Sequence, residues 1–382
     1  MMLDKQILRI PGPTPIPPRV EHALGQPMIG HRNPQMGELH ARLKPKLAKI
    51  FGTKKDVMIL SSSGTGAMET AAVNLCKSGD EVIVVVTGAF GERFADICDA
   101  HGLTTYRLEM NWGTACTPEK LKAFLREHPS VKAVFMTYCE TSTSVLNPIK
   151  ELTDTVRSES DALVAVDGVS CIAGVEANMD DWGVDIYVTG SQKAFMLPPG
   201  LAFVAASERA REAFKKNDHS RFYFDLNKYA EKIENNSTPF TPPVSLLFGL
   251  DEALNMMMEE GLENVFKRHR LMSNMTRSAI EALGIPLLTE NKYASPTVTA
   301  VKPEQVDAEK VRKILIQDFK IYVAGGPKHL KGKIFRIGHM GYCSPADVFE
   351  YIAALEVAFK KAGANIELGA GTKAAQEIFL NA

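Results

Sequence analysis

The residues best suited to chemistry lie between Val184 and Ser207, where Lys193 follows an apolar run. A small polar turn precedes the lysine, and a Pro-Pro-Gly break and a second apolar run, Leu201–Ala206, follow it. A lysine at the mouth of a buried strand loses hydration, which lowers the pKa of its ammonium group and makes the amine a better nucleophile. Such an amine forms Schiff bases with carbonyls, most often that of pyridoxal phosphate. A surface lysine that ends a strand is the alternative.

Asp167 is the sharpest acidic candidate because it directly follows the apolar run Leu163–Val166. A carboxylate at the end of a buried strand is costly without a partner. A protonated pyridine nitrogen is such a partner, and the pairing keeps the ring an electron sink. A helix N-cap and a metal ligand are the alternatives, but the sequence offers no companion ligands, so no metal is expected.

Two glycine-rich turns follow other apolar runs. In SSSGTGAMETAAVNL, residues 61–75, Ser63, Gly64 and Thr65 precede a predicted helix, whose free N–H groups favour an anion such as phosphate. It is not a P-loop, because no Gly-Lys-Ser/Thr follows, and an ordinary helix start remains the alternative. In TGAFGERF, residues 87–94, Phe90 is placed to stack on a flat cofactor ring or simply to pack.

Arg336 lies in FRIGHMG, residues 335–341, on a predicted strand near the C-terminus. Its rigid guanidinium fork suits a carboxylate, which an amino-acid substrate must carry, while a surface ion pair is the usual alternative. CETSTSVLNP, residues 139–148, supplies several hydroxyls after another apolar run.

The elements that position these residues are predicted from alternating apolar runs and helical patterns. The candidate strands are 57–60, 82–86, 104–108, 133–137, 163–166, 186–189 and 201–205, and helical patterns over 66–77, 91–101, 118–127 and 148–158 lie between them. Short apolar runs joined by helices predict an α/β fold with a mainly parallel, seven-stranded sheet. Ligands collect at the carboxyl ends of such strands.

The flanking segments differ in character. The Pro-rich residues 1–18 predict an extended arm, and a helix over 36–51 follows, strained by Pro45. A long helical pattern over 246–283 is interrupted near Gly261, and the remainder reads as a smaller α+β domain with strands at 294–301 and 334–338 and helices at 307–318 and 345–362. We expect an arm (1–18), a large domain (19–260) and a small C-terminal domain (261–382).

Composition excludes several classes of protein. The 44 Lys and Arg residues nearly balance the 45 Asp and Glu residues. The chain therefore lacks a large net charge that would attract nucleic acid or a membrane surface. The six cysteines form no CxxC pair and suggest reduced thiols. No signal peptide or membrane-spanning run is apparent, and a cytoplasmic location is expected.

Ten segments in order resemble the class V, fold-type-I aminotransferases that use pyridoxal phosphate, in particular the alanine–glyoxylate and serine–pyruvate (serine–glyoxylate) branch. The segments are PGPTPIPPRV, GHRNPQM, SGTGAMETA, GAFGER, ETSTSVLNP, VDGVS, TGSQKAF, TPPVS, EEGLENV and FRIGHMG. The resemblance extends over nearly the whole chain, and the ten segments together are far more specific for this family than any one of them. The resemblance implies the fold-type-I transferase fold.

The resemblance also implies roles for individual residues. Lys193 matches the lysine that holds the cofactor and moves the substrate proton, and Asp167 matches the partner of the pyridine nitrogen. The expected cofactor contacts are Ser63, Gly64, Thr65 and Gln192 at the phosphate, Thr141 near the phenolic oxygen and Phe90 as the stacking ring. Thr238 and Thr241 match residues that reach the phosphate from the other subunit, which implies a homodimer with shared sites. Arg336 matches the clamp for the substrate carboxylate.

The arm at Gly12 and the loop at His31 and Arg32 are expected to line the substrate entrance. With no second basic residue clearly placed for a distal carboxylate, apart from Arg32, the expected reaction is ping-pong transfer of an amino group from alanine or serine to glyoxylate or pyruvate. Aspartate or ureidoglycine as amino partner, a cysteine desulfurase or another lyase, and a non-catalytic cofactor-binding subunit are the alternatives.

Overall fold

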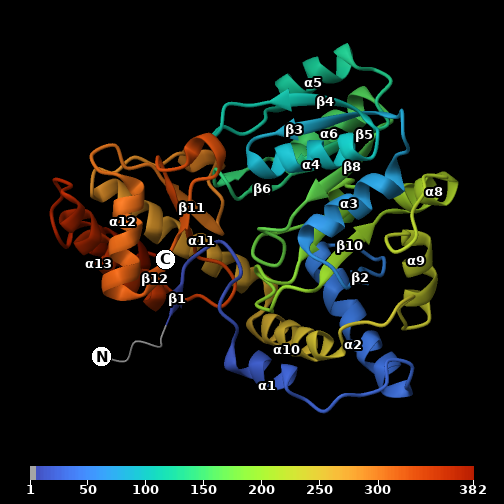
Figure 1. The fold of residues 1–382 in the computed structure, drawn as a ribbon, viewed down its shortest axis with the longest axis horizontal. Helices are drawn as coiled ribbons and strands as arrows, with labels where there is room; N and C mark the ends of the chain where they lie inside the picture. The colour runs from blue at the N-terminus through green and yellow to red at the C-terminus, as the bar shows by residue number, and fades with distance from the viewer. Residues whose placement is uncertain (1–5) are drawn as a thin grey trace.

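The computed structural model describes residues 6–382, so residues 1–5 of the predicted arm lie outside the described residues. A large sheet with helices on both faces occupies one side of the molecule, and a smaller group of strands and helices from the C-terminal third lies beside it (Figure 1). None of the helices within residues 6–382 is both long and apolar enough to cross a membrane.

The large sheet contains seven strands in the order β2-β10-β9-β8-β5-β3-β4. The strands are β2 (Met58–Leu60), β3 (Glu81–Val86), β4 (Thr104–Glu109), β5 (Ala133–Thr137), β8 (Leu163–Asp167), β9 (Ile186–Gly190) and β10 (Ala202–Ala206). Only β10 is antiparallel to its neighbours in this sheet. The prediction of a mainly parallel seven-stranded sheet is confirmed, and each strand end lies within one residue of its predicted place.

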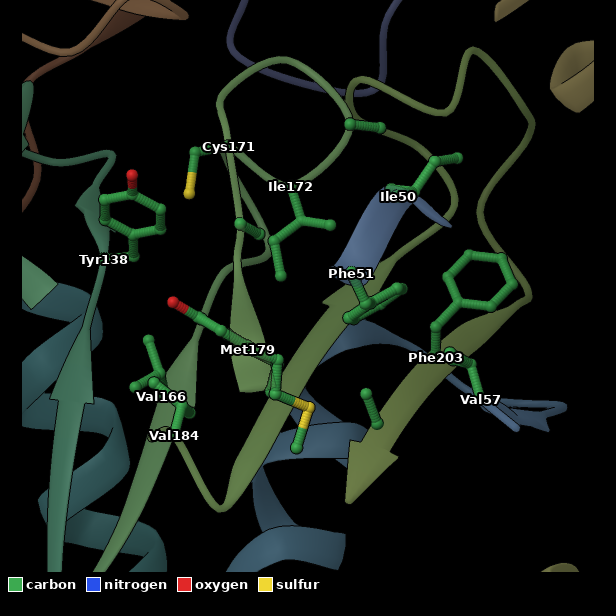
Figure 2. Close-up of a cluster of buried hydrophobic side chains, with 14 of the residues drawn as sticks. Ile50, Phe51, Val57, Tyr138, Val166, Cys171, Ile172, Met179, Val184 and Phe203 are labelled. Carbon is green, nitrogen blue, oxygen red and sulfur yellow. The ribbon is translucent and has the colours of Figure 1, made fainter. Parts of the chain in front are cut away.

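Both faces of this sheet are buried, which explains why its strands are apolar runs rather than alternating ones. One face packs against α3 (Gly64–Leu75), α4 (Ala89–Ala100), α8 (Glu208–Lys216) and α9 (Leu226–Glu234). The other packs against α2 (Pro34–Phe51), α5 (Pro118–Glu127), α6 (Ile149–Glu159), α7 (Met179–Trp182) and α10 (Val244–Glu260). Figure 2 shows part of this second core, to which Phe51 of α2 and Val166 and Phe203 of the sheet contribute.

The C-terminal third has its own core around a three-stranded antiparallel sheet in the order β11-β14-β13. Its elements are α11 (Leu262–Ala282), η1 (Asn291–Tyr293), β11 (Val298–Val301), α12 (Ala308–Ile314), η2 (Leu315–Phe319), β12 (Ile321–Tyr322), β13 (Ala324–Gly325), η3 (Lys328–Leu330), β14 (Phe335–Gly338), α13 (Pro345–Ala362) and α14 (Ala370–Leu380). Gly261, at φ +82°, separates α10, which joins the core of the large sheet, from α11, which joins this one. The domain limits 1–18, 19–260 and 261–382 remain a prediction that this break supports.

The N-terminal segment connects the two cores. Its strand β1 (Ile7–Leu8) pairs in parallel with β12, and the chain then runs without a helix to α1 (Pro18–Leu24), which packs on α10. In Figure 1 this blue segment passes between the small domain and the rest of the molecule. A short hairpin, β6 (Cys139–Glu140) and β7 (Val145–Leu146), follows β5.

Candidate active site

Lys193 lies in the turn between β9 and β10, and its side chain is 9% exposed. Its Nζ donates to the carbonyl of Pro11, and the Thr14 hydroxyl donates to the Lys193 carbonyl at 2.9 Å. Burial lowers the pKa of Lys193 to about 8, with Arg336 acting in the same direction and the Cys139 thiol and Asp167 opposing it. The free amine is therefore accessible near neutral pH, as nucleophilic chemistry requires.

Gly12 touches this lysine directly. Its φ of +107° lies in the region that glycine tolerates best. A Cβ at this position would lie 2.5 Å from Cδ and 2.7 Å from Nζ of Lys193. The arm thus forms one wall of the space around the amine, and a side chain at position 12 would displace the lysine.

Asp167 ends β8 and is 3% exposed. Its Oδ1 accepts a hydrogen bond of 2.8 Å from Val169 N, and no other hydrogen bond to this carboxylate is found within residues 6–382. Burial raises its pKa to about 7, with Glu140 adding to the shift and Lys193 opposing it. No helix starts directly after Asp167, so the N-cap alternative is wrong. The described residues also contain no group of three or more His, Cys, Asp or Glu arranged to hold a metal ion.

The predicted phosphate contacts lie in the turn where β2 leads into α3. Ser63 caps this helix by accepting from Gly66 N at 3.3 Å, and a Cβ on Gly64 would lie 2.7 Å from Val169. The neighbouring Gln192 is oriented toward the same place, since a Cβ on Gly190 would lie 2.9 Å from its Oε1 and 3.4 Å from Gly64 N. That Oε1 is buried without a hydrogen-bond partner within residues 6–382.

The ring-stacking candidate stands at the start of α4. Arg93 Cζ lies 4.7 Å from the centroid of the Phe90 ring, and its Nη1 donates to the Thr65 hydroxyl at 3.2 Å. Phe90 and Thr65 are thereby brought to one edge, and Arg93, which sequence reasoning did not single out, joins them. A cation near the predicted phosphate contacts favours an anionic ligand.

Arg336 projects from β14 toward the hairpin of the large domain. Its Nη1 donates to the Thr141 carbonyl at 3.1 Å, and Nε and Nη2 donate to the Gly325 carbonyl at 3.0 and 2.8 Å. The Thr141 hydroxyl bonds that of Ser170, close to Asp167. Burial lowers the pKa of Arg336 to about 10, and no ion pair to it is found in the part of the chain described. A half-buried guanidinium without a carboxylate partner is suited to an anionic substrate.

Four other predicted residues lie apart from this group. The Thr238 hydroxyl donates to the Phe240 carbonyl, and Arg32 donates to the Thr238 carbonyl, both at 2.7 Å. Thr241 is exposed and lines a surface hollow with His31. None of these contacts connects them to Lys193 within one chain.

Glu140 is a residue whose importance the sequence analysis missed. It is fully buried beside Thr141, and burial raises its pKa although four hydrogen-bond donors face it. The available signal was an acidic residue three positions after the end of β5, in the ETSTS segment, where only the hydroxyls were considered.

The comparisons agree with this geometry. Residues 19–343 match the family model for "Aminotransferase class-V". The chain therefore belongs to the class V aminotransferases, enzymes that use pyridoxal phosphate.

Three relatives align over nearly the full chain. A "Soluble hydrogenase, small subunit" of Synechococcus sp. is 43% identical, covering all of both chains. An L-aspartate–glyoxylate aminotransferase of Paracoccus denitrificans is 37% identical, over 98% of this chain and 96% of that protein. A serine–glyoxylate aminotransferase of Hyphomicrobium methylovorum is 37% identical, over 97% and 94%.

Solved structures give the same family. The ureidoglycine–glyoxylate aminotransferase of Bacillus subtilis superposes with a TM-score of 0.91 at 30% identity, over 99% of this chain and 98% of that one. An alanine–glyoxylate aminotransferase of Nostoc sp. gives 0.89 at 30% identity, over 94% and 96%. The predicted family, fold type and cofactor are thus confirmed.

Proposed function

We propose that this aminotransferase moves an amino group from a small L-amino acid, alanine or serine, to glyoxylate or pyruvate. The observation that carries the choice of a small donor is Arg336, which acts on Lys193 and has no ion pair within residues 6–382. Arg93 also has no ion pair there, but it bonds Thr65 beside the proposed phosphate contacts. Arg32, the other candidate for a distal carboxylate, donates instead to the backbone around Thr238. Three of the aminotransferases described above are named for glyoxylate, but each is named for a different amino donor: serine, aspartate or ureidoglycine. They therefore support glyoxylate as the acceptor more strongly than they support any one donor.

The residues fit pyridoxal phosphate. The α3 N-terminus with Ser63, Gly64, Thr65 and Gln192 would hold the phosphate, since the free N–H groups of the helix start donate to an anion. The Gln192 amide, whose Oε1 has no partner within residues 6–382, would turn its NH2 group to the same anion. Phe90 would cover one ring face, and the Thr141 hydroxyl would lie near the phenolic oxygen. Asp167, with one carboxylate oxygen bonded to Val169, would keep the ring nitrogen protonated.

When bound, the cofactor supplies a conjugated ring that takes up the electron pair left at the substrate α-carbon. Arg336 orients the substrate carboxylate so that the α-hydrogen faces Lys193. The Lys193 amine, its pKa lowered by burial, removes that proton as general base and returns it at the end of each half-reaction. The arm at Gly12 restricts the lysine to this position.

The working unit would be a cytoplasmic homodimer with shared sites. In its support, Thr238, Thr241 and His31 are separated from Lys193 in one chain, and Thr241 is exposed, as a surface that meets a second copy would be. All six cysteines are unpaired, which agrees with a reducing compartment.

Two alternatives have specific observations to weigh. A cysteine desulfurase needs a mobile thiolate, but all six cysteines are buried, and burial raises the pKa of Cys139 and Cys343 to about 11. A subunit role is suggested by the name of the Synechococcus relative, although this chain retains Lys193, Asp167 and Arg336 in one place.

The deciding experiment is half-reaction spectroscopy of the purified protein with a panel of amino acids. The visible absorption of the lysine-bound cofactor should disappear with alanine or serine and return with glyoxylate or pyruvate. A response to aspartate alone would replace the proposed donor, and sulfide release from cysteine would indicate the desulfurase. No response to any donor would favour the subunit role.

A further inference from the structure

Glu140 ends the short strand β6 with a fully buried carboxylate that is surrounded by donors. Oε2 accepts from Phe90 N at 3.1 Å and from Gly91 N at 3.0 Å. Oε1 accepts from Ser142 N at 3.1 Å and from the Ser142 hydroxyl. No ion pair to Glu140 is found within residues 6–382. Its negative charge is therefore held by backbone N–H groups and one hydroxyl.

Only a carboxylate fits this arrangement. The Ser142 hydroxyl oxygen accepts from Ala89 N at 2.9 Å, so its proton points to Glu140. Every neighbour of the Glu140 carboxylate is thus a donor. A glutamine at this position would direct its NH2 group at one set of N–H groups and leave them without an acceptor.

The carboxylate also takes the place of a helix cap. Gly88, the N-cap residue of α4, makes no side-chain cap, and a Cβ there would lie 2.6 Å from Glu140 Cγ. Glu140 thus satisfies the N–H groups of Phe90 and Gly91, the second and third residues of α4, from a distant segment. It also places a negative charge at the helix N-terminus, where it is favourable.

These contacts connect residues with different proposed roles. Phe90, whose backbone N–H is held, carries the ring proposed to stack on the cofactor. Thr141, the next residue after Glu140, binds Arg336 through its carbonyl and Ser170 through its hydroxyl. We propose that Glu140 is a positioning residue for the cofactor, joining the Phe90 turn to the Thr141 turn so that both face the ring, an inference that rests on the function proposed above.

Glu356 provides a matched control because it makes the same kind of cap far along the chain. It is 4% exposed and accepts from Gly369 N at 2.5 Å, from Thr372 N at 2.6 Å and from the Thr372 hydroxyl at 3.0 Å. These donors lie at the N-terminus of α14, whose N-cap Gly369 likewise makes no side-chain cap. Glu356→Gln should therefore cost similar stability without affecting the cofactor.

The test compares wild type, Glu140→Gln and Glu356→Gln by titration with pyridoxal phosphate and by amide hydrogen exchange of the cofactor-free proteins. Glu140→Gln should raise the cofactor dissociation constant roughly tenfold or more, the loss expected for one hydrogen bond to a charged group. It should also speed exchange at Phe90 and Gly91, whereas Glu356→Gln should do so only at Gly369 and Thr372.

Equal cofactor affinity in the two variants would overturn the proposal. If Glu140→Gln does not fold, Ser142→Ala removes one donor, and it should raise the dissociation constant by a smaller factor; an unchanged constant would also overturn the proposal. A wild-type protein that binds the cofactor but transfers no amino group would contradict the proposed function alone, because the affinity comparison does not depend on turnover.

Discussion

The two parts of the predicted site differ sharply in how they are built. Around Lys193, segments from the arm, the large sheet and β14 converge, and the polar groups are buried and bonded across long sequence separations. Around Thr238 and Thr241, polar groups bond to near neighbours and to Arg32, and Thr241 is exposed. Within one chain, the residues around Lys193 are thus brought together, whereas Thr238 is buried apart from them and Thr241 lies on the surface.

Replacing Lys193 should reduce activity more than any substitution around Thr238 and Thr241. Lys193→Ala removes the amine, and we expect amino-group transfer to fall by about 10⁴-fold or more. The visible absorption of the lysine-bound cofactor should also vanish. Lys267→Ala, at an exposed position of α11, is the control and should leave both unchanged. An active Lys193→Ala enzyme would contradict the assignment.

Replacing Asp167 tests how much the buried carboxylate destabilises the cofactor-free protein. Because the folded pKa of about 7 exceeds that of a free carboxyl, the folded state binds more protons between about pH 4 and pH 7, and stability falls as pH rises through that range. Asp167→Asn should remove this dependence and stabilise the cofactor-free protein at pH 7.5 by an amount on the order of a few kcal/mol.

Denaturant unfolding of the cofactor-free proteins at pH 5 and pH 7.5 measures the effect of Asp167→Asn. The same variant should transfer amino groups more slowly, because an amide is a poor partner for a protonated ring nitrogen. If Asp167→Asn has the wild-type free energy of unfolding at both pH values, burial of the Asp167 carboxylate does not destabilise the protein.

Gly12 tests how tightly the arm confines the lysine. Gly12→Ala would place a Cβ 2.5 Å from Lys193 Cδ, and displacing the amine by about 1 Å should lower turnover about 100-fold. Gly79→Ala is the matched control, since Gly79 also has positive φ (+88°) but no atom within 4 Å of the added Cβ. The control should lose about 1 kcal/mol of stability and no activity.

The smallest effect is expected in the exposed half. Thr241→Ala should raise the cofactor dissociation constant about tenfold if the residue reaches the partner's phosphate site. Hybrid dimers of Lys193→Ala and Thr241→Ala chains, isolated with two different tags, sharpen this test. With shared sites, the one lysine-bearing site should bind the cofactor with wild-type affinity. Weakened affinity in the hybrid would place Thr241 in its own chain's site.

The sequence predicted the elements whose signals are local. Apolar runs bounded by turns located all seven strands, and a lysine and an aspartate at strand ends indicated the edge of the sheet that carries the candidate site. Several helices were not predicted, namely α1, α7, α8, α9 and α14. Among them, α9 lies in the polar, turn-rich residues 215–245, and α14 lies beyond the last pattern considered.

What escaped prediction depends on contacts between distant residues. Glu140 looks like any polar residue after a strand until Phe90 and Ser142 are brought against it. Gly12 was assigned to the substrate entrance from resemblance, but its contact with Lys193 joins residues 181 positions apart. Likewise, the pairing of β1 with β12 has no local signature, because two-residue strands carry no period.

The arm is synthesised long before the strand with which it pairs. Pro11, Gly12 and Thr14 leave the ribosome before any strand of the large sheet, whereas the partner of their anchor, Ile321–Tyr322, emerges some 300 residues later. At about 5–20 residues per second, the large sheet can form while the arm still has no strand to pair with. The arm can therefore close over the Lys193 amine only after Ile321–Tyr322 has been made.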